Sequence, residues 1–194
     1  ENENKNEKKL AFCIPSTTNL RDWNDISETY LYTILLPSII QLSEEYNIKL
    51  FIGYDHDDKL YSNIILPNKY QNIEIEWTPF TDCKGNPCKI WTDLCKNCIG
   101  QGYDYYMVCG DDIRFDPNKD WLNIFIEKLK KNNNIGYSAG YSNNDIIPTQ
   151  FLFHKNHYEI LGWIFPPQIK NWQCDNFIYN IYNNEHINYG NWLK

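Results

Sequence analysis

The chain has 194 residues, 42% of them hydrophobic, and a formal net charge of −7. That length suits one domain with a buried core of its own. The negative charge repels phosphate backbones and anionic membranes, which argues against nucleic acid as the main partner. No stretch approaches the roughly 20 apolar residues that a membrane-spanning helix needs.

The first nine residues, Glu1 to Lys9, are polar and charged and lack the apolar core of a signal peptide. We expect residues 1–9 to form a disordered tail or a linker from a longer multidomain chain, and residues 10–194 to form one domain. The seven cysteines are an odd number and lie mostly in apolar runs. This usage favours reduced thiols and a cytoplasmic location over a secreted disulfide framework.

Strands and helices are expected to alternate over the first two thirds of the domain. Short apolar runs predict buried strands at 10–15, 49–54, 73–77 and 105–109. Apolar residues at helical spacing predict helices at 26–46, 88–100 and 120–131. This alternation favours an α/β, Rossmann-like fold, in which a mixed, mostly parallel sheet is flanked by helices.

The remainder of the chain follows a different pattern. We expect strands at 136–141 and 150–154, a short helix over 156–161, an aromatic loop and a final helix over 175–183. Acidic residues follow the second and fourth predicted strands of the domain. Open α/β sheets bind ligands at the carboxyl ends of their strands, so a site is expected there.

The strongest functional signal is Gly110-Asp111-Asp112, directly after the apolar run 105–109. A buried strand that ends in two carboxylates places charge where burial is costly. A hard divalent cation bound through oxygen would compensate that charge. Such a metal could bridge the phosphates of a nucleoside diphosphate and stabilise the leaving group. An acidic turn or a helix N-cap would explain the same residues without a metal.

This arrangement resembles the GT-A family of glycosyltransferases. In that family an Asp-any-Asp motif after the fourth strand holds Mn²⁺ or Mg²⁺ on the donor diphosphate. Gly110 stands at the first position of the motif, so the chain departs from the strict pattern. Asp112 keeps the place of the residue that reaches the metal, and the resemblance therefore implies Asp112 as a ligand. Asp111 could contact the metal, the ribose or only water.

Two further stretches resemble the same family. Ser16 and Thr17 follow the first predicted strand, where the family receives the nucleotide with backbone and hydroxyl groups. Asp55 ends the second predicted strand, where the family places an acid that reads the nucleotide base. The neighbouring Asp57 and Asp58 are open to a simpler interpretation as solvated turn residues.

The run from Asn171 to Asp175 is similar to glycosyltransferase domains that decorate the capsids and fibres of large DNA viruses. Many GT-A enzymes carry a Glu-Asp pair at this place, and Cys174 replaces the Glu here. The resemblance implies Asp175 as the general base that takes the proton from the acceptor hydroxyl. The structural alternative is an N-cap for the final helix. Trp172 is expected to stack on a sugar face.

Other residues have both a functional and a structural explanation. Arg21 could pair with phosphate in a forked geometry or lie exposed on the surface. His186 lies where some GT-A enzymes supply a third metal ligand, and a solvated turn histidine would look the same. Four cysteines could form a zinc site, although their spacing is loose and two of them suit helix packing: Cys83, Cys88, Cys95 and Cys98.

We therefore expect transfer of a sugar from a nucleotide sugar to a hydroxyl of a glycan or glycoprotein. The expected donor is a UDP-sugar, and the expected transferred group is a hexose. The alternative is a catalytically silent domain of the same fold that binds glycan or scaffolds a partner. Asp112 and Asp175 favour the enzyme, since a silent relative would be free to lose either. A sugar-phosphate nucleotidyltransferase would want a glycine-rich, basic loop after the first strand, and residues 16–24 contain no glycine.

Overall fold

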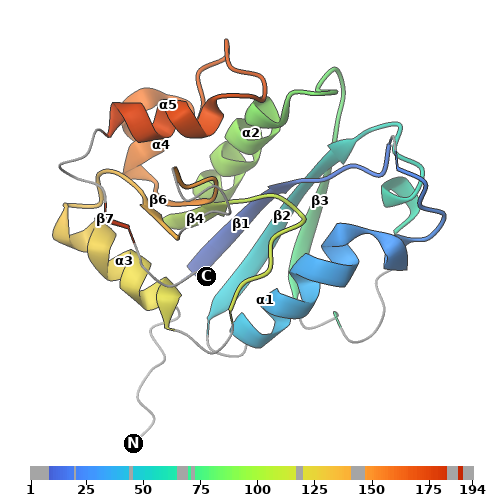
Figure 1. Cartoon of the computed structure of the whole chain (residues 1–194), viewed down its shortest axis with the longest axis horizontal. Helices are drawn as coiled ribbons and strands as arrows, with labels where there is room; N and C mark the ends of the chain where they lie inside the picture. The colour runs from blue at the N-terminus through green and yellow to red at the C-terminus, as the bar shows by residue number, and fades with distance from the viewer. Residues whose placement is uncertain are drawn as a thin grey trace, which may run out of the picture.

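The computed structural model describes residues 9–19, 21–43, 46–64, 70, 73–116, 120–140, 147–182 and 188–189. Within them, seven strands form one sheet in the order β3-β2-β1-β4-β6-β5-β7. The strands are β1 (Lys9–Pro15), β2 (Asn47–Asp55), β3 (Glu74–Phe80), β4 (Tyr105–Val108), β5 (Ser138–Ala139), β6 (Phe151–His154) and β7 (Asn188–Tyr189). Strands β1 to β4 are parallel to one another, whereas β6 is antiparallel to β4 and β5. The expected mixed, mostly parallel sheet is confirmed (Figure 1).

Helices cover both faces of this sheet (Figure 1). The α-helices are α1 (Leu36–Leu42), α2 (Pro87–Gly100), α3 (Trp121–Lys131), α4 (Asn156–Leu161) and α5 (Cys174–Ile181). One face carries α2, α4 and α5, and the other carries α1 and α3. Across the described part of the chain, no helix has the length and hydropathy that crossing a bilayer requires.

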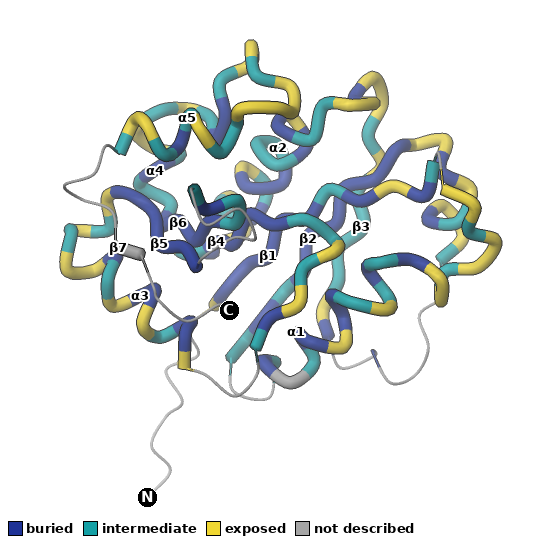
Figure 2. The backbone as a smooth tube through the Cα atoms, viewed as in Figure 1, coloured by how far each residue is buried: buried dark blue, intermediate teal, exposed yellow. Residues whose placement is uncertain are grey.

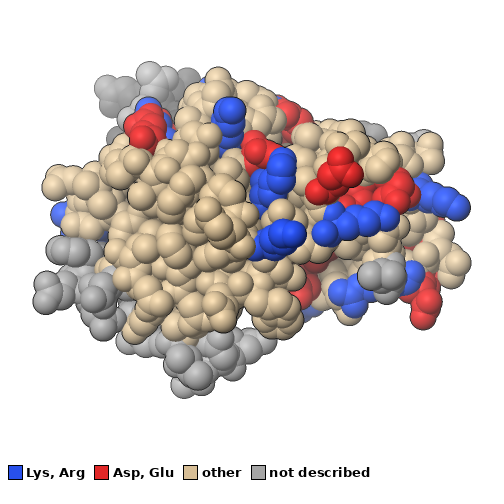
Figure 3. Space-filling view, turned by 90° about the horizontal axis from the view of Figure 1, so that it is seen from above, with Lys and Arg blue, Asp and Glu red and all other residues tan. Residues whose placement is uncertain are grey.

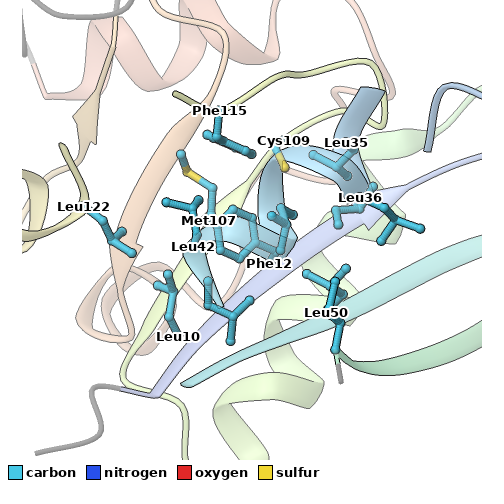
Figure 4. Close-up of a cluster of buried hydrophobic side chains, with 14 of the residues drawn as sticks. Leu10, Phe12, Leu35, Leu36, Leu42, Leu50, Met107, Cys109, Phe115 and Leu122 are labelled. Carbon is cyan, nitrogen blue, oxygen red and sulfur yellow. The ribbon is translucent and has the colours of Figure 1, made fainter. Parts of the chain in front are cut away.

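Alternation along the strands divides the core into two layers. In β1, Leu10, Phe12 and Ile14 pack with α1 and α3, whereas Ala11 and Cys13 pack with α2. Successive side chains of a strand point to opposite faces, so one wholly buried strand supplies both layers. Figure 4 shows the first layer, and Figure 2 shows that β1, β2, β4 and β6 are buried along most of their length.

The segment between β1 and β2 departs from the expectation. Apolar spacing predicts one helix over 26–46, and this prediction is wrong. The structure has the 3₁₀ turn η1 (Ile26–Glu28), the π-helical turn η2 (Leu31–Leu35) and then α1. Pro37 explains the break, because it has no N–H to donate to the carbonyl of Thr33 and its ring pushes that carbonyl away.

Several strand boundaries also differ, and two of them need comment. Strand β1 starts at Lys9, one residue before the predicted strand and inside the predicted tail. Of the strand predicted over 136–141, the structure describes residues 136–140, and of these only Ser138–Ala139 pair as β5. Gly136 has a φ of 107°, which no extended strand accommodates, so the strand cannot begin there.

Candidate functional site

Three strand ends meet at one edge of the sheet. Strand β1 lies between β2 and β4 and is parallel to both, so the carboxyl ends of all three lie together. Chain segments leave this edge in opposite directions, because β2 and β4 flank β1 on its two sides. Such a switch point is where open α/β sheets bind ligands. Ser16 follows β1, Asp55 ends β2, and Asp111 lies just past β4.

Ser16 and Asp111 are joined directly. The Ser16 Oγ donates a hydrogen bond of 2.5 Å to Asp111 Oδ2. A second hydroxyl, that of Tyr61, lies 2.7 Å from the same Ser16 oxygen. Because serine has only one hydroxyl hydrogen, Tyr61 is the donor in this second bond. Burial raises the pKa of Tyr61, which keeps the phenol protonated and able to donate.

The acidic pair differs in exposure. Asp111 is half-buried, whereas Asp112 is exposed. Burial raises the pKa of Asp111, and the neighbouring Asp112 carboxylate raises it further against the opposing effect of the Ser16 hydrogen bond. The Asp111 carboxylate is therefore less stable as an anion than an ordinary aspartate, and a cation placed beside it would be favoured.

Two side chains hold the loop that carries this pair. The Trp91 indole N–H on α2 donates to the Cys109 carbonyl at 3.2 Å. The Gly110 N–H donates to Gln150 Oε1, next to β6, at 3.1 Å. A Cβ on Gly110 would lie 2.7 Å from Asp112 Oδ1. Glycine at this position therefore lets the Asp112 carboxylate fold back over the loop.

Asp58 is a buried acceptor for several hydrogen bonds. The interpretation of Asp58 as a solvated turn residue is wrong, since its exposure is 0%. It accepts from the Thr18 N–H and hydroxyl, both at 2.6 Å, and from the N–H groups of Leu60 and Tyr61. By contrast, Asp57 is exposed, as expected, and pairs with Lys84 at 2.6 Å. Asp58 thus fastens the loop after β1 to the turn after β2.

Asp55 is held in place from the same loop. Its Oδ2 accepts from the Thr17 hydroxyl at 3.0 Å and from the Asn19 amide at 3.3 Å. The residue is 8% exposed and lines a pocket. Because both bonds use Oδ2, the carboxylate can still accept a hydrogen bond from a ligand through Oδ1.

The pocket has a volume of about 260 Å³ and lies at the switch point. It is lined by Pro15, Ser16, Thr17, Arg21, Trp23, Asp55, Cys83, Gly85, Asn86, Pro87, Ile90, Asp111 and Asn171. Five of the residues predicted from sequence are in this set, and they come from the ends of three different strands or the loops that follow them. The Arg21 guanidinium lies 5.5 Å from the Trp23 ring centroid and 5.2 Å from that of Tyr30. These rings hold the cation at the pocket wall.

The N-terminus of α2 forms another wall. Asn86 caps this 14-residue helix by accepting from the Lys89 N–H, and the Cys88 N–H donates to the Lys170 carbonyl. Pro87 has no N–H, so the first turn offers a ligand the positive end of the helix dipole rather than unpaired donors. Gly53 allows this approach, because a Cβ there would overlap the Ile90 side chain.

Asp112, Trp172 and Asp175 do not line this pocket. Trp172 is 88% exposed. Asp175 is the second residue of α5, and the N-cap is Gln173, so the interpretation of Asp175 as the N-cap is wrong. Its Oδ1 accepts only locally, from the Asn176 N–H at 2.8 Å. His186 lies outside the described residues.

The side chains that could bind a metal are few at this site. Among the described residues, no group of three or more His, Cys, Asp or Glu side chains gathers closely enough to hold a metal ion. The looser zinc alternative therefore has no support, and Cys95 and Cys98 pack in the core instead. Asp111 and Asp112 offer oxygen ligands that fit Mg²⁺ or Mn²⁺, which often take one or two carboxylates and complete their shell with water and phosphate.

No protein-family model matches the sequence, and neither does any curated protein. Solved structures match it by shape. TarS residues 1–349 from S. aureus, in complex with UDP-GlcNAc, align with a TM-score of 0.66 at 14% identity, over 95% of this chain and 56% of that one. This chain is therefore little more than half as long as the TarS structure. The fold is GT-A-like.

Two other structures share the fold. A putative nucleotide-diphospho-sugar transferase from Desulfovibrio desulfuricans G20 has a TM-score of 0.51 at 14% identity, over 95% of this chain and 80% of that one. A cytidylyltransferase from Leptospira borgpetersenii has a TM-score of 0.56 at 8% identity, over 95% of this chain and 76% of that one. The structures that share this fold thus include a putative nucleotide-diphospho-sugar transferase and a cytidylyltransferase.

Three residues at the pocket or beside it are not among the residues predicted from sequence: Trp23, Asp58 and Tyr61. Asp58 had a usable signal, since aspartate often accepts from N–H groups two and three residues later, as it does here in the turn before the 3₁₀ turn η3 (Tyr61–Asn63). Trp23 and the hydroxyl of Tyr61 reach the site only through tertiary contacts, which leave no periodic trace in the sequence.

Proposed function

We propose that this domain transfers a sugar from a nucleotide sugar to a hydroxyl of a glycan or glycoprotein. The proposed donor is a UDP-sugar, and the proposed transferred group is a hexose. One observation carries the proposal. The Asp111–Asp112 pair lies beside a pocket that is also lined by Ser16, Thr17 and Asp55, which lie at the ends of neighbouring strands. The TarS structure of similar fold contains UDP-GlcNAc, which supports this choice of donor.

The pocket suits the nucleoside half of such a donor. Its volume of about 260 Å³ lies just below the roughly 300–1,000 Å³ of typical ligand sites, so the sugar would lie outside it. Trp23 offers an aromatic ring against a base, and Asp55 Oδ1 can accept from a base or ribose donor. The diphosphate would then run past Arg21 toward Asp111.

Mn²⁺ or Mg²⁺ is proposed to join the diphosphate to the acidic pair. Asp112 is the proposed principal ligand, with Asp111 beside it. A metal supplies charge stabilisation to the departing nucleoside diphosphate. Two carboxylates without a third protein ligand hold such an ion weakly, so metal and nucleotide should bind more tightly together than apart.

The acceptor side is proposed to lie toward α5. Asp175 would take the proton from the acceptor hydroxyl, and the exposed Trp172 ring would stack on a sugar face. Figure 3 shows charged side chains gathered over the half of this face that carries the ends of β2 and β3, whereas the half over α4 and α5 is mostly uncharged. A neutral glycan fits that half. The sequence resemblance to viral capsid- and fibre-decorating domains supports a glycoprotein acceptor.

Calorimetry with UDP, in the presence of Mn²⁺ or of EDTA, tests the proposal. We expect at least about tenfold tighter binding with Mn²⁺, and loss of this difference in Asp112→Asn. The matched control is Asp57→Asn, an exposed carboxylate that should leave the metal effect intact. Equal affinity for UDP with and without metal would overturn the metal role.

A nucleotidyltransferase is the second candidate, because the cytidylyltransferase shares the fold. That chemistry releases pyrophosphate from a nucleoside triphosphate and needs basic groups around it. The loop over residues 16–24 contains one basic residue, Arg21, and no glycine. Pyrophosphate release from CTP or UTP with a sugar 1-phosphate would replace our proposal. Binding of UDP-sugars without hydrolysis or transfer would point to the silent domain.

A further inference from the structure

The Ser16 hydroxyl lies between a donor and an acceptor. It donates to Asp111 Oδ2 at 2.5 Å, and it accepts from the Tyr61 hydroxyl, whose oxygen is 2.7 Å away. The Ser16 N–H donates to the Gly53 carbonyl at 2.9 Å, so the backbone that carries the side chain is fixed as well. Because serine has one hydroxyl hydrogen and Asp111 receives it, Ser16 has no hydrogen left to donate to a nucleotide.

Tyr61 is held in place by groups other than its own hydroxyl. Its side chain is 1% exposed and does not line the pocket. The ring packs against those of Tyr54 and Trp77, with centroids 5.9 Å and 5.5 Å away. The Tyr61 N–H donates to Asp58 Oδ1 at 3.1 Å. Ring and backbone are thus fixed by packing and by Asp58, and they direct the hydroxyl at Ser16.

The two hydrogen bonds act on Asp111 in series. A hydroxyl that accepts on one side and donates on the other has one preferred direction, so the Tyr61 bond turns the Ser16 hydrogen toward Asp111. Successive hydrogen bonds in a site of low dielectric also strengthen one another. The series uses Oδ2 of Asp111, and Oδ1 can still face a cation. The Tyr61 hydroxyl therefore influences a carboxylate that it does not touch.

We propose that Tyr61 is a positioning residue for metal-dependent nucleotide binding, and that it acts through the Ser16 hydroxyl to hold the Asp111 carboxylate beside Asp112. The inference rests on the proposed function, because it concerns the metal that the acidic pair would bind. Tyr61 contacts neither the nucleotide nor the metal in this arrangement. Its hydroxyl should therefore affect the gain in nucleotide affinity that the metal provides, and not the affinity measured without metal.

Calorimetry with UDP on the whole chain, in Mn²⁺ and in EDTA, tests the inference. Tyr61→Phe removes the hydroxyl and keeps the ring that packs against Tyr54 and Trp77. We expect the gain in UDP affinity from Mn²⁺ to fall about three- to tenfold, the usual effect of one lost hydrogen bond, while the affinity in EDTA stays near the wild-type value. The matched control is Tyr54→Phe, a neighbouring tyrosine of the same core layer, which should leave the gain intact.

A double-mutant cycle tests whether Tyr61 acts through Ser16. Ser16→Ala interrupts the series at its centre and should lower the gain from Mn²⁺ at least as much as Tyr61→Phe does. In the double variant, Tyr61→Phe should add no further loss, because its effect has no path without the Ser16 hydroxyl. The paramagnetic resonance signal of free Mn²⁺ measures the Mn²⁺ affinity of the UDP-bound chain, which should fall in the same variants and not in Tyr54→Phe.

The outcomes separate this inference from the proposed function. A full gain from Mn²⁺ in Tyr61→Phe would overturn the inference and leave the proposed function standing, whereas no gain in the wild type would overturn both. Additive losses in the double variant would contradict a path through Ser16. Equal losses in Mn²⁺ and in EDTA would make Tyr61 a structural residue. Thermal melting shows which variants fold, and if Tyr61→Phe does not, a full gain in Ser16→Ala overturns the inference.

Discussion

The Ser16 hydroxyl and the Asp111 carboxylate share a hydrogen bond of 2.5 Å that joins the end of β1 to the loop after β4. Tyr61 lies on the other side of Ser16, and the Tyr61 N–H donates to Asp58. A chain of hydrogen bonds thus runs from a fully buried aspartate to the acidic pair. The position of the Asp111 carboxylate therefore depends in part on Tyr61 and Asp58, which do not line the pocket.

Asp111→Asn is expected to stabilise the metal-free protein at neutral pH. The substitution removes a charge whose pKa is raised by burial and by Asp112, and the amide oxygen can still accept from Ser16. Because the folded pKa exceeds the unfolded one, the folded state binds more protons between the two values, and the contribution of Asp111 to stability falls as pH rises through that window.

Melting temperatures from about pH 4 to about pH 8 measure this effect. The melting temperature of the variant should exceed that of the wild type most at neutral pH, and the difference should shrink as the pH falls. Each kcal/mol of added stability should raise the melting temperature by about 2–4 °C. Asp57→Asn is the control, since the Lys84 ion pair lowers the pKa of Asp57 and its loss should not stabilise. A variant that melts lower than the wild type at neutral pH would contradict the prediction.

Asp58→Ala is expected to lower the free energy of unfolding by about 3 kcal/mol or more, because buried donors on Thr18, Leu60 and Tyr61 lose their acceptor. Urea unfolding measures the change. Asp57→Ala is the adjacent control and should change stability little, because Asp57 is exposed and its ion pair with Lys84 is solvated. Equal losses in the two variants would show that Asp58 does not anchor the loop.

Much of the fold was predictable because buried parallel strands leave a continuous apolar run. The stretch over 10–15 is such a run, and it became β1 with five fully buried residues from Leu10 to Ile14. The broken helix before β2 was not predictable from apolar spacing, since Pro37 interrupts hydrogen bonds without interrupting the pattern.

The site followed the same logic. Ser16, Asp55 and Asp111 were found because each ends a strand, and parallel neighbours bring such ends together. The prediction for Asp58 was wrong because an acidic run has the same sequence whether its side chains are exposed to solvent or buried as hydrogen-bond acceptors. Trp23 enters the pocket through a loop whose path depends on packing against Arg21 and Tyr30.

Gly110→Ala is expected to impair metal-dependent nucleotide binding while leaving stability nearly unchanged. The new Cβ would lie 2.7 Å from Asp112 Oδ1, and the exposed Asp112 side chain can rotate away at small cost. We expect a loss of about tenfold or more in UDP affinity with Mn²⁺ and no change with EDTA. Gly100→Ala is the control, because a Cβ there meets nothing within 4 Å. Unchanged UDP affinity in the presence of Mn²⁺ would mean that metal-dependent binding does not require the present position of the Asp112 carboxylate.

Asp175→Asn separates catalysis from binding. If Asp175 takes the proton from the acceptor hydroxyl, transfer should fall by roughly 10²-fold or more, because an amide cannot act as the base. UDP and Mn²⁺ affinity should stay near the wild-type values, since Asp175 does not line the nucleotide pocket. The amide oxygen can still accept from the Asn176 N–H, so α5 should remain folded.

The measurements are transfer from the nucleotide sugar that calorimetry selects, nucleotide affinity and thermal melting, all on the same preparation. Asn176→Ala is the matched control, because Asn176 is the exposed neighbour on the same helix turn. Full transfer activity in Asp175→Asn would mean that the base lies elsewhere. Joint loss of nucleotide binding and stability would make Asp175 a structural residue, because a base that acts only on the acceptor affects neither.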